Sequence, residues 1–434
     1  MSFIADNQTL EDLNLLGKYR PHSIFGIFNQ VKTYGAGRLL EAMFSNPLTE
    51  ADAINARAGT FQYFQRRQLV FPFSTEQIGQ VENYLGIGAG SNRVTVMADV
   101  LKKRLLGSFV RDEQYKLLYG GLMATIDMLK TLRSFVGRME EKDSPFQSRV
   151  QDVKAFFSDK RIESIFQVET LPLLQVARYD HLLKRSFSDE METVLNIVYE
   201  LDLYIAVSDV ARVRGFSYAM AFPKDHNIFQ ATELRHPGLE KGVGNELALY
   251  RESNMVFLTG ANMAGKSTFM KSFGIAVYMA HMGFPVAAKE LKFSVRDGLF
   301  SSINVADNLA QGYSHFYAEV LRVKTVAEAV SSGRHLIVLF DELFKGTNVK
   351  DAYDATLAVT RLLSDYRNCC FIISTHIIEV GEALRDHRNL QFTFLPTIMD
   401  GNIPRYTYRF REGITNDRHG MMIIENEKIL ELLK

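Results

Sequence analysis

A glycine-rich loop between a strand-like run and a helical pattern constrains the fold of this chain more than any other feature. Residues 259–268 read TGANMAGKST, and Gly260 to Ser267 match the pattern G-x-x-x-x-G-K-S. An apolar run, MVFL at 255–258, precedes the loop, and a helical pattern follows from Ser267. This context separates a phosphate-binding P-loop from a chance match. Glycines let successive backbone N–H groups converge on a phosphate, and the helix N-terminus adds partial positive charge. The pattern predicts a nucleotide-binding α/β domain.

Each position of this loop has an expected role. Lys266 would bring a positive charge to the β- and γ-phosphates of ATP, and Ser267 would ligate Mg²⁺ through its hydroxyl. The alternative is a glycine turn with a surface lysine, which leaves the order of strand, loop and helix unexplained. The other loop residues that we expect at the nucleotide are Gly260, Ala261, Asn262, Met263, Ala264, Gly265 and Thr268.

A second motif supplies carboxylates for the metal and for water. Residues 335–348 read HLIVLFDELFKGTN, and the apolar run Leu336–Phe340 is typical of a parallel strand buried on both faces. Asp341 is the expected Mg²⁺ partner, and Glu342 is the expected general base or water-positioning residue. Alone, the two carboxylates fit a solvated strand end or a helix cap equally well. The P-loop upstream favours the catalytic interpretation.

A third motif places a histidine at a strand end. Residues 371–380 read FIISTHIIEV, so a buried strand ends in Ser374, Thr375 and His376. Open α/β sheets bind ligands at the carboxyl ends of their strands. We therefore expect His376 to sense or stabilise the γ-phosphate, although a lone histidine is more often structural.

Hydrophobic periodicity divides the chain into two parts. Long amphipathic helices, in a bundle or an extended lever, are predicted from about residue 10 to 230. After a boundary between about 225 and 240, strand-like runs alternate with helical patterns, which predicts a mostly parallel sheet. We predict an α plus α/β chain, with a helical domain at 1–230, a P-loop domain at 231–434 and a short helix at 425–434. The apolar steps of three and four are clearest at Leu117, Leu118, Leu122, Ile126, Leu129 and Leu132.

Composition limits how the chain could bind nucleic acid. Its 434 residues carry 50 Lys plus Arg and 50 Asp plus Glu, so the formal net charge is zero. Without a strongly basic domain, binding to DNA would need local patches or encirclement. Lys102–Arg104 and the pair of Arg212 and Arg214 are candidate DNA contacts, although such clusters are usually solvated helix faces.

We find no sign of secretion or membrane insertion. The N-terminus, MSFIADNQTLEDL, lacks the basic and apolar regions of a signal peptide. The apolar segment Phe273–Ala288 is broken by His281 and Pro285 and is shorter than the ~20 residues that span a bilayer. Cys369 and Cys370 are adjacent and fit a buried strand better than a disulfide or a zinc site. We expect a soluble, cytoplasmic protein that does not associate with membranes.

These motifs, in this order, resemble the ATPase domain of the MutS family of DNA mismatch-repair proteins. The family's loop has the form TG-P-NM-GGKST, from which Ala261 and Ala264 depart without removing a phosphate-binding glycine. Asn262 matches an asparagine that contacts phosphate in the family. DELFKGTN resembles the family's DE-x-x-x-GT segment, and STHIIEV resembles TH-x-x-E-L. The resemblance implies an ABC-type P-loop ATPase that uses ATP and Mg²⁺.

The segment DNLAQGYSHFYAEV, residues 307–320, resembles the family signature between the P-loop and the acidic strand. In that family a serine of one subunit approaches the γ-phosphate bound to the other, and Ser314 takes this position. Tyr313 and His315 replace the family's usual arginine and threonine. The resemblance implies a homodimer through the ATPase domain, in which Ser314 and the segment Gly346–Asn348 cross to the partner's nucleotide.

Further resemblances are less specific. The family places an aromatic or histidine side chain against adenine, and Tyr408 in TYRFREG falls at that point, although an ordinary sheet tyrosine fits equally well. Val243 would pack on the other face of the base. RHPGLE at 235–240 resembles the family's junction into the ATPase, and residues 23–57 resemble the start of its helical core and lever.

Some parts of the family pattern are absent. Its mismatch-recognising members carry a Phe-x-Glu wedge whose phenylalanine stacks on the mispaired base. Here Phe-x-Glu occurs only at Phe340–Glu342 and Phe410–Glu412, within the ATPase motifs. We expect a truncated MutS-like protein with a core and lever and an ATPase domain, lacking the mismatch-recognition and connector domains. A single short helix at 425–434, in place of the family's helix-turn-helix, would make the dimer weak or ATP-dependent.

The resemblance implies an ATP-dependent DNA-binding protein of mismatch repair. ATP binding and hydrolysis would switch a homodimer on mismatched or branched DNA, with repair or recombination proteins as further partners. The alternative is an ATP-switched assembly protein that binds other proteins and no DNA, which the zero net charge favours. A transporter-type ATPase is disfavoured because its L-S-G-G-Q signature is absent.

Overall fold

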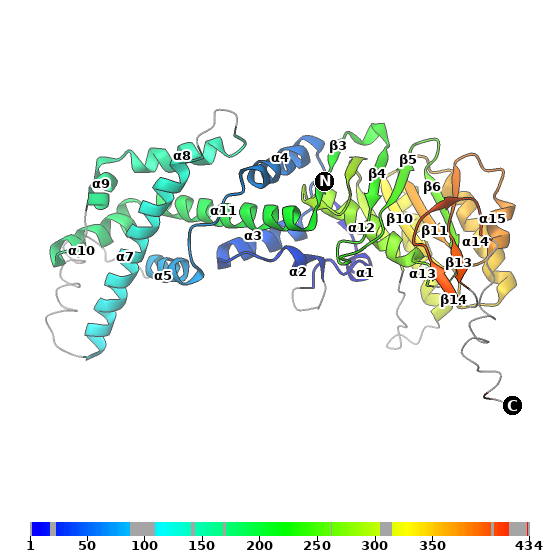
Figure 1. Ribbon diagram of the computed structural model, residues 1–434, viewed down its shortest axis with the longest axis horizontal. Coiled ribbons are helices and arrows are strands. Elements are labelled where there is room, and N and C mark those ends of the chain that lie inside the picture. The colour runs from blue at the N-terminus through cyan, green and yellow to red at the C-terminus, as the bar shows by residue number, and fades with distance from the viewer. Residues whose placement is uncertain are drawn as a thin grey trace. The chain divides into compact units, whose positions relative to one another are not determined.

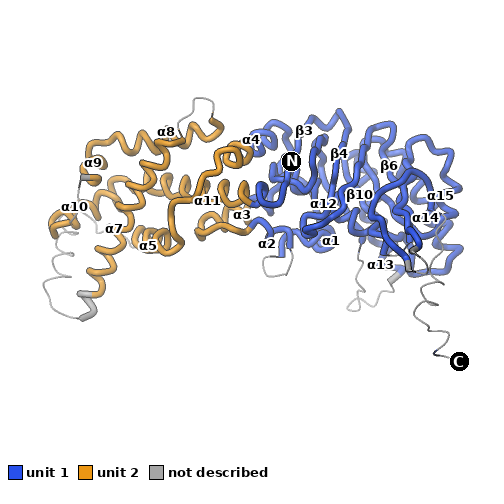
Figure 2. The backbone as a smooth tube through the Cα atoms, viewed as in Figure 1, with its two compact units in different colours: residues 1–28, 43–58, 210–434 blue, residues 29–42, 59–209 orange. Residues whose placement is uncertain are grey.

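The computed structural model describes residues 2–17, 23–86, 109–139, 144–167, 171–261, 263–303, 315–400, 403–415 and 432 (Figure 1). The chain forms two compact units, which Figure 2 shows in different colours. The first, here called the α/β unit, comprises residues 1–28, 43–58 and 210–434. The second, the helical unit, comprises residues 29–42 and 59–209.

These units divide the chain differently from the expected division at residues 230 and 231. Residues 1–28 and 43–58 group with the C-terminal half. Of their short helices, α2 (Ile24–Phe28) buries apolar side chains, whereas α1 (Asn7–Asp12) buries the polar residues Thr9 and Asp12. The ring of Phe28, for example, lies 5.7 Å from that of Phe284. Packing contacts therefore assign these segments to the α/β unit. The change in hydrophobic periodicity near residue 230 does not reveal that assignment.

The α/β unit is built on a seven-stranded sheet. Six of its strands run parallel in the order β1-β9-β10-β11-β6-β12, and β15 joins β12 antiparallel at the edge. Every residue of β6 and β11 is buried, as expected for parallel strands covered on both faces. The predicted parallel sheet is thus present. The strands are β1 (Ile4–Ala5), β6 (Met255–Gly260), β9 (Gly298–Ser302), β10 (Leu336–Asp341), β11 (Cys370–Ser374), β12 (Leu390–Leu395) and β15 (Arg411–Glu412).

Helices cover both faces of this sheet. A side chain at Gly274 in α12 would meet Leu339 at 3.0 Å, so α12 packs on the face to which Leu339 points. Val338 and Phe340 instead join a core with residues of α13 and α14. Because successive strand side chains point to opposite faces, α12 covers one face and α13 and α14 the other. The helices are α12 (Lys266–His281), α13 (His315–Ser331), α14 (Val349–Ser364) and α15 (Ile378–Ala383).

The α/β unit also contains smaller sheets that the sequence analysis did not predict. A four-stranded sheet has the order β3-β8-β4-β5, and two further sheets are the pairs β2-β7 and β13-β14. A short 3-10 helix, Lys224–His226, follows β3. The strands are β2 (Ser217–Tyr218), β3 (Met220–Phe222), β4 (Phe229–Leu234), β5 (Asn245–Leu249), β7 (Pro285–Val286), β8 (Glu290–Ser294), β13 (Thr397–Asp400) and β14 (Ile403–Tyr406).

The described residues of the helical unit form helices and no strand. Leu122, Ile126, Leu129 and Leu132 are at most 1% exposed, as their spacing predicts, whereas Leu117 is 71% exposed. The chain passes between the units within α3, α4 and α11. The elements are α3 (Tyr34–Ser45), α4 (Ala51–Arg67), α5 (Thr75–Gly86), α7 (Phe109–Gly137), α8 (Gln147–Phe157), α9 (Lys160–Glu163), the 3-10 helix Ser164–Gln167, α10 (Leu173–His181), the π-helical turn Leu182–Ser186 and α11 (Ser188–Arg214).

Two expectations about apolar segments can be compared with the structure. Cys369 and Cys370 are both free and buried, and Cys370 begins β11, as expected. Among the described residues, no helix combines the length and apolar character needed to cross a bilayer.

Candidate nucleotide-binding site

The main sheet brings the three predicted motifs to one edge. Strands β10, β11 and β6 are neighbours and run parallel, so their carboxyl ends lie together. Asp341 pairs in register with Ser374, and Ser374 pairs with Leu258, two residues before Gly260. Motifs separated by up to about a hundred residues in the sequence therefore converge where parallel sheets bind ligands.

The loop between β6 and α12 has backbone geometry that favours glycine. Gly260 has a φ of 143° and Gly265 a φ of 104°, values that side-chain-bearing residues rarely adopt. A Cβ at Gly265 would also lie 3.1 Å from the Tyr408 ring, and one at Gly260 would lie 3.2 Å from the Leu395 carbonyl. Met263 has a φ of 70° and is 76% exposed. The loop is thus a tight turn that approaches neighbouring segments closely.

Lys266 begins α12 and is only 5% exposed. Its Nζ donates hydrogen bonds to the carbonyl oxygens of Gly260, at 2.9 Å, and Ala261, at 3.3 Å. Burial lowers the pKa of Lys266, and the nearby Glu342 and Asp341 carboxylates oppose that effect. No ion pair joins Lys266 to any carboxylate within the described part of the chain. Its ammonium group is therefore held by two carbonyl oxygens without a direct carboxylate partner among the described residues, which suits an anionic ligand.

Asp341 and Ser267 have positions consistent with a metal bound through a ligand. Asp341 ends β10, and its Oδ1 accepts a hydrogen bond from the Ser374 hydroxyl. Ser267 and Thr268 are exposed in the first turn of α12. The residues described contain no group of three or more His, Cys, Asp or Glu side chains that would hold a metal alone. A Mg²⁺ ion here would need phosphate oxygens to complete its ligands.

Glu342 follows β10 in an unusual backbone conformation. Its φ is 57°, and Phe344 has a φ of 59°, so two side-chain-bearing residues occupy the left-handed region. The N–H of Glu342 donates to the Ser374 carbonyl at 2.9 Å, which fixes the turn. Glu342 Oε1 lies 3.9 Å from Nδ1 of His376, whose side chain is 59% exposed. Such strain is common where a side chain must point into a functional site.

A pocket of about 420 Å³ adjoins the loop. Tyr408 lines it, together with Val243 and the loop residues Met263, Ala264 and Gly265. The expected adenine contacts are thus brought together beside the predicted phosphate loop. The pocket's further lining residues are Leu234, His236, Leu239, Lys241, Gly242, Asn245, Thr268, Phe269, Ser272 and Leu395.

Sequence reasoning missed two residues of this pocket. Asn245 fixes the Tyr408 segment, because its Nδ2 donates to the Tyr408 carbonyl at 2.9 Å and its Oδ1 accepts from Phe410 N–H at 2.8 Å. His236 lies in the pocket, and burial, aided by the charge of Lys271, lowers its pKa. The RHPGLE resemblance drew attention to His236 only as a junction, whereas nothing near Asn245 signalled its role.

Several predicted residues have no described position or have another role. Asn262, Ser314, Lys102–Arg104 and the predicted helix 425–434, apart from Leu432, lie outside the described residues. The Asn348 side chain caps α14 by accepting from Asp351 N–H at 3.0 Å. Arg214 donates to the Pro237 carbonyl at 3.1 Å, so it has a structural contact that a purely solvated charge would lack.

A glycine loop that positions a buried lysine between a central parallel strand and a helix is the architecture of α/β nucleotide-binding domains. Residues 256–431 match the family model for MutS domain V. The resemblance to the MutS family is therefore confirmed for this part of the chain, which is similar to domain V of MutS proteins.

Two relatives are DNA mismatch repair proteins named MutS. The protein of Petrotoga mobilis is 27% identical over 263 residues, covering 59% of this chain and 32% of the relative. The protein of Lysinibacillus sphaericus is 26% identical over 255 residues, covering 57% of this chain and 29% of the relative. The aligned segments span about a third of the length of these relatives.

Proposed function

We propose that this protein binds ATP with Mg²⁺ in the pocket and loop described above, and that it hydrolyses the nucleotide. The observation that carries the proposal is the state of Lys266. Its ammonium group is buried at the carboxyl edge of the sheet, is held by two carbonyl oxygens and forms no direct ion pair with any carboxylate that the structure describes. Burying a charge without a partner is costly, so the arrangement is best explained by a phosphate ligand.

The neighbouring residues divide the remaining tasks. The backbone N–H groups of residues 261–267 would surround the β-phosphate, while the Tyr408 ring and Val243 would enclose the base. Ser267 and Asp341 would hold Mg²⁺, which when bound screens the charge of the phosphates. Glu342 would orient or deprotonate the attacking water, and His376, 3.9 Å from its carboxylate, would contact the γ-phosphate.

The same proposal extends to a homodimer. Ser314 and the segment Gly346–Asn348 would reach the nucleotide of the partner subunit, so ATP binding would close the dimer and hydrolysis would release it. The MutS names of the relatives support DNA, mismatched or branched, as the target, with repair or recombination proteins as further partners. The alternative is an ATP-switched assembly protein without DNA binding, favoured by equal numbers of acidic and basic residues, 50 of each.

Glu342→Gln tests the enzymatic part of the proposal. Loss of a general base lowers rates by about 100- to 10,000-fold, whereas ATP binding should persist. Hydrolysis and nucleotide affinity would be measured with Mg²⁺, with Glu246→Gln on the exposed side of β5 as the control. Sedimentation of Glu342→Gln with ATP should show a dimer. A monomer under these conditions would rule out the composite site.

DNA binding is tested separately on duplex, mismatched and four-way DNA, with and without ATP. Phosphate-mediated binding is strongest at low salt, so about 50 mM salt is the most permissive condition. Absence of binding there would reject the DNA target and leave the protein-assembly alternative. Preferential binding to a mismatch would show that recognition does not require the Phe-x-Glu wedge.

A further inference from the structure

Residues 4–15, here called the N-terminal segment, are built into the edge of the main sheet. Strand β1 pairs parallel with β9, and Ile4 N–H donates to the Asp297 carbonyl at 3.0 Å. A Cβ at Gly298 would lie 2.6 Å from the Ile4 carbonyl oxygen, so the close approach depends on glycine. Leu13 and Leu15 are 1% and 0% exposed. The segment is therefore an integral part of the α/β unit.

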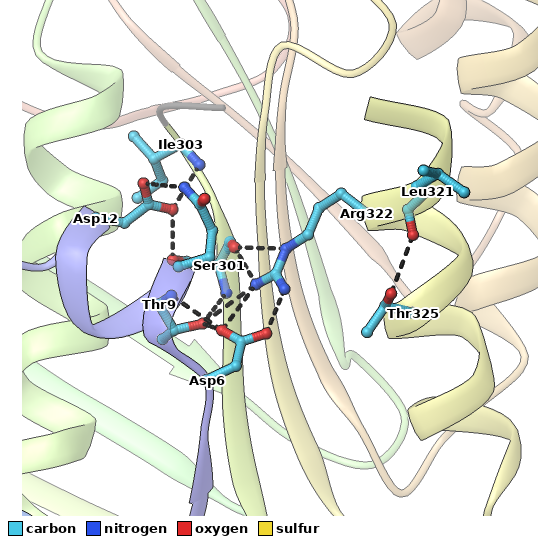
Figure 3. Close-up of polar contacts among 9 residues, drawn as sticks. Asp6, Thr9, Asp12, Ser301, Ile303, Leu321, Arg322 and Thr325 are labelled. Atoms are coloured by element: carbon cyan, nitrogen blue, oxygen red, sulfur yellow. Dashed lines mark hydrogen bonds and ion pairs between the residues drawn. The ribbon is translucent and has the colours of Figure 1, made fainter. Parts of the chain in front are cut away.

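The helix of this segment binds the end of β9 (Figure 3). Asp12 Oδ2 accepts from the Ser301 hydroxyl at 2.7 Å and from Ile303 N–H at 2.9 Å. Thr9 Oγ1 accepts from Ser301 N–H at 3.0 Å. Asp12 is only 4% exposed, and hydrogen bonds to a buried carboxylate are among the stronger ones in proteins. These contacts fix the point at which the chain leaves β9.

The same segment also binds α13, the helix that follows. The guanidinium group of Arg322 forms an ion pair with Asp6, and its side chain is 10% exposed. Its Nη2 donates to Thr9 Oγ1 at 3.2 Å, and its Nε donates to the Ser301 carbonyl at 3.1 Å. Figure 3 shows Arg322 reaching from α13 to both the N-terminal segment and β9. Three parts of the chain are thus joined through one guanidinium group.

These contacts lie on either side of a segment with a proposed role in catalysis, at Ile303 before it and at Arg322, within α13, after it. Ile303 and His315 flank residues 304–314, which include Ser314. Helix α13 also carries Glu319, whose Oε2 accepts from Gly346 N–H at 3.4 Å. The N-terminal segment thus holds the end of β9 and α13 together, and α13 in turn contacts the segment Gly346–Asn348 through Glu319. We propose that it positions these elements for ATP hydrolysis, with Asp6, Asp12 and Arg322 as positioning residues.

This inference rests on the proposed ATPase function, and it predicts a separation of binding from turnover. In the sheet order, β1 lies at one edge, whereas β12, which supplies Leu395 to the base pocket, lies toward the other. Loosening the N-terminal segment should therefore leave nucleotide affinity unchanged. Turnover should fall, because small misplacements of catalytic groups lower rates steeply.

The test uses Arg322→Gln and Asp12→Asn in the full-length chain. We expect kcat to fall roughly tenfold while the nucleotide Kd stays within about twofold of wild type. Arg322→Lys keeps the charge opposite Asp6 and should recover part of the rate. Glu11→Gln is the matched control, because Glu11 is an exposed carboxylate on the same helix, next to Asp12, and should behave as wild type.

Hydrogen exchange supplies a readout independent of activity. Arg322→Gln should speed exchange at residues 298–303 and 315–322 and leave β12 unchanged. Variants with normal kcat and normal exchange would overturn the inference, as would a joint loss of affinity and turnover, which indicates general destabilisation. A wild-type protein without hydrolysis would overturn the ATPase proposal itself, whereas an active wild type with unaffected variants would overturn only the positioning role.

Discussion

Two lysine side chains, one in each compact unit, are withdrawn from solvent but held in opposite ways. Lys184 lies in the π-helical turn of the helical unit, where its Nζ is 3.0 Å from Asp180 Oδ1 and its side chain is 3% exposed. Lys266, in the α/β unit, donates through its ammonium group to the carbonyl oxygens of Gly260 and Ala261 and forms no ion pair with a carboxylate of the described residues. Lys184 forms a direct ion pair within its own unit, whereas Lys266 forms none with the carboxylates that the structure describes. A buried cation without an internal counterion is the better indicator of a ligand site.

The surroundings of Lys184 form a closed network. Its Nζ lies 3.8 Å from the centroid of the Tyr84 ring, and the Tyr84 hydroxyl donates to Asp180 Oδ1 at 2.7 Å. Burial, followed by the charge of Asp180, raises the pKa of Tyr84 well above its usual value. A Cβ at Gly121 would lie 2.5 Å from Tyr84 Cβ, so α7 also approaches closely. Every polar group of the network has its partner inside the unit.

Lys184→Met should therefore give the largest effect on stability. It leaves Asp180 buried without its cation, which in other proteins costs about 3–5 kcal/mol. Urea unfolding, with hydrogen exchange at α10 to localise the change, measures the loss. Lys160→Met, at an exposed lysine of α9, serves as the control. If both variants unfold alike, the Lys184–Asp180 pair does not stabilise the helical unit. Nucleotide affinity at the α/β unit should not change.

The contrast also explains what could be predicted from sequence. The position of Lys266 at the start of a helix after a buried strand was predictable because strand, glycine loop and helix are contiguous, and Asp341 and Glu342 follow an apolar run without interruption. Lys184 had no such signature, since a helical pattern does not reveal a π-helical turn or a buried partner. The local order of elements therefore predicted where the glycine loop lies in the sheet, whereas only packing revealed that Asp180 pairs with Lys184.

Long-range pairing accounts for the other omissions. Strand β1 is two residues long, and its partner β9 begins at Gly298. So short a strand has no readable alternation, and a partner almost three hundred residues away leaves no local signal. The base pocket shows the same limit. Tyr408 was expected by resemblance, but the contribution of Asn245 arises from a contact 163 residues distant in the sequence.

Lys266→Met tests the other buried lysine of the comparison, the one expected to contribute to ligand binding and not to stability. Removing a charged group that contacts phosphate should weaken ATP binding by about 100-fold, or about 2.7 kcal/mol. Stability should stay the same or rise slightly, because an unpaired buried ammonium is replaced by an apolar side chain. Titration with a fluorescent ATP analogue and urea unfolding measure the two quantities. A loss of stability like that of Lys184→Met, with ATP binding intact, would reverse the assignment of the two lysines.

His281 shows a third way to bury a basic group, which is to keep it neutral. Its Nδ1 lies 2.8 Å from the Leu48 carbonyl, and its Nε2 accepts from Arg296 N–H at 3.2 Å. The contact with Leu48 requires a proton on Nδ1, and the contact with Arg296 requires a lone pair on Nε2. Burial lowers the pKa of His281 to about 4, while the Leu48 carbonyl and the Asp297 charge oppose the shift and the Arg296 charge adds to it.

A pH titration of stability tests this third arrangement and should give the smallest effect. The pKa of His281 in the folded state lies below the value of about 6.5 expected in the unfolded chain. Between these two pKa values the unfolded state therefore binds a proton at His281 that the folded state does not bind. The contribution of His281 to the unfolding free energy is fully present above pH 6.5 and decreases toward pH 4. Between pH 7.5 and 5.5 the loss is about 1.4 kcal/mol. Burial also lowers the pKa values of His236 and His335, which contribute in the same direction. Urea unfolding at the two pH values gives the total, and His281→Asn should flatten the slope by the His281 share. If His281→Asn leaves the pH dependence of the unfolding free energy unchanged, this histidine is not buried as the neutral ring. His281 would then not be a third arrangement beside those of Lys184 and Lys266.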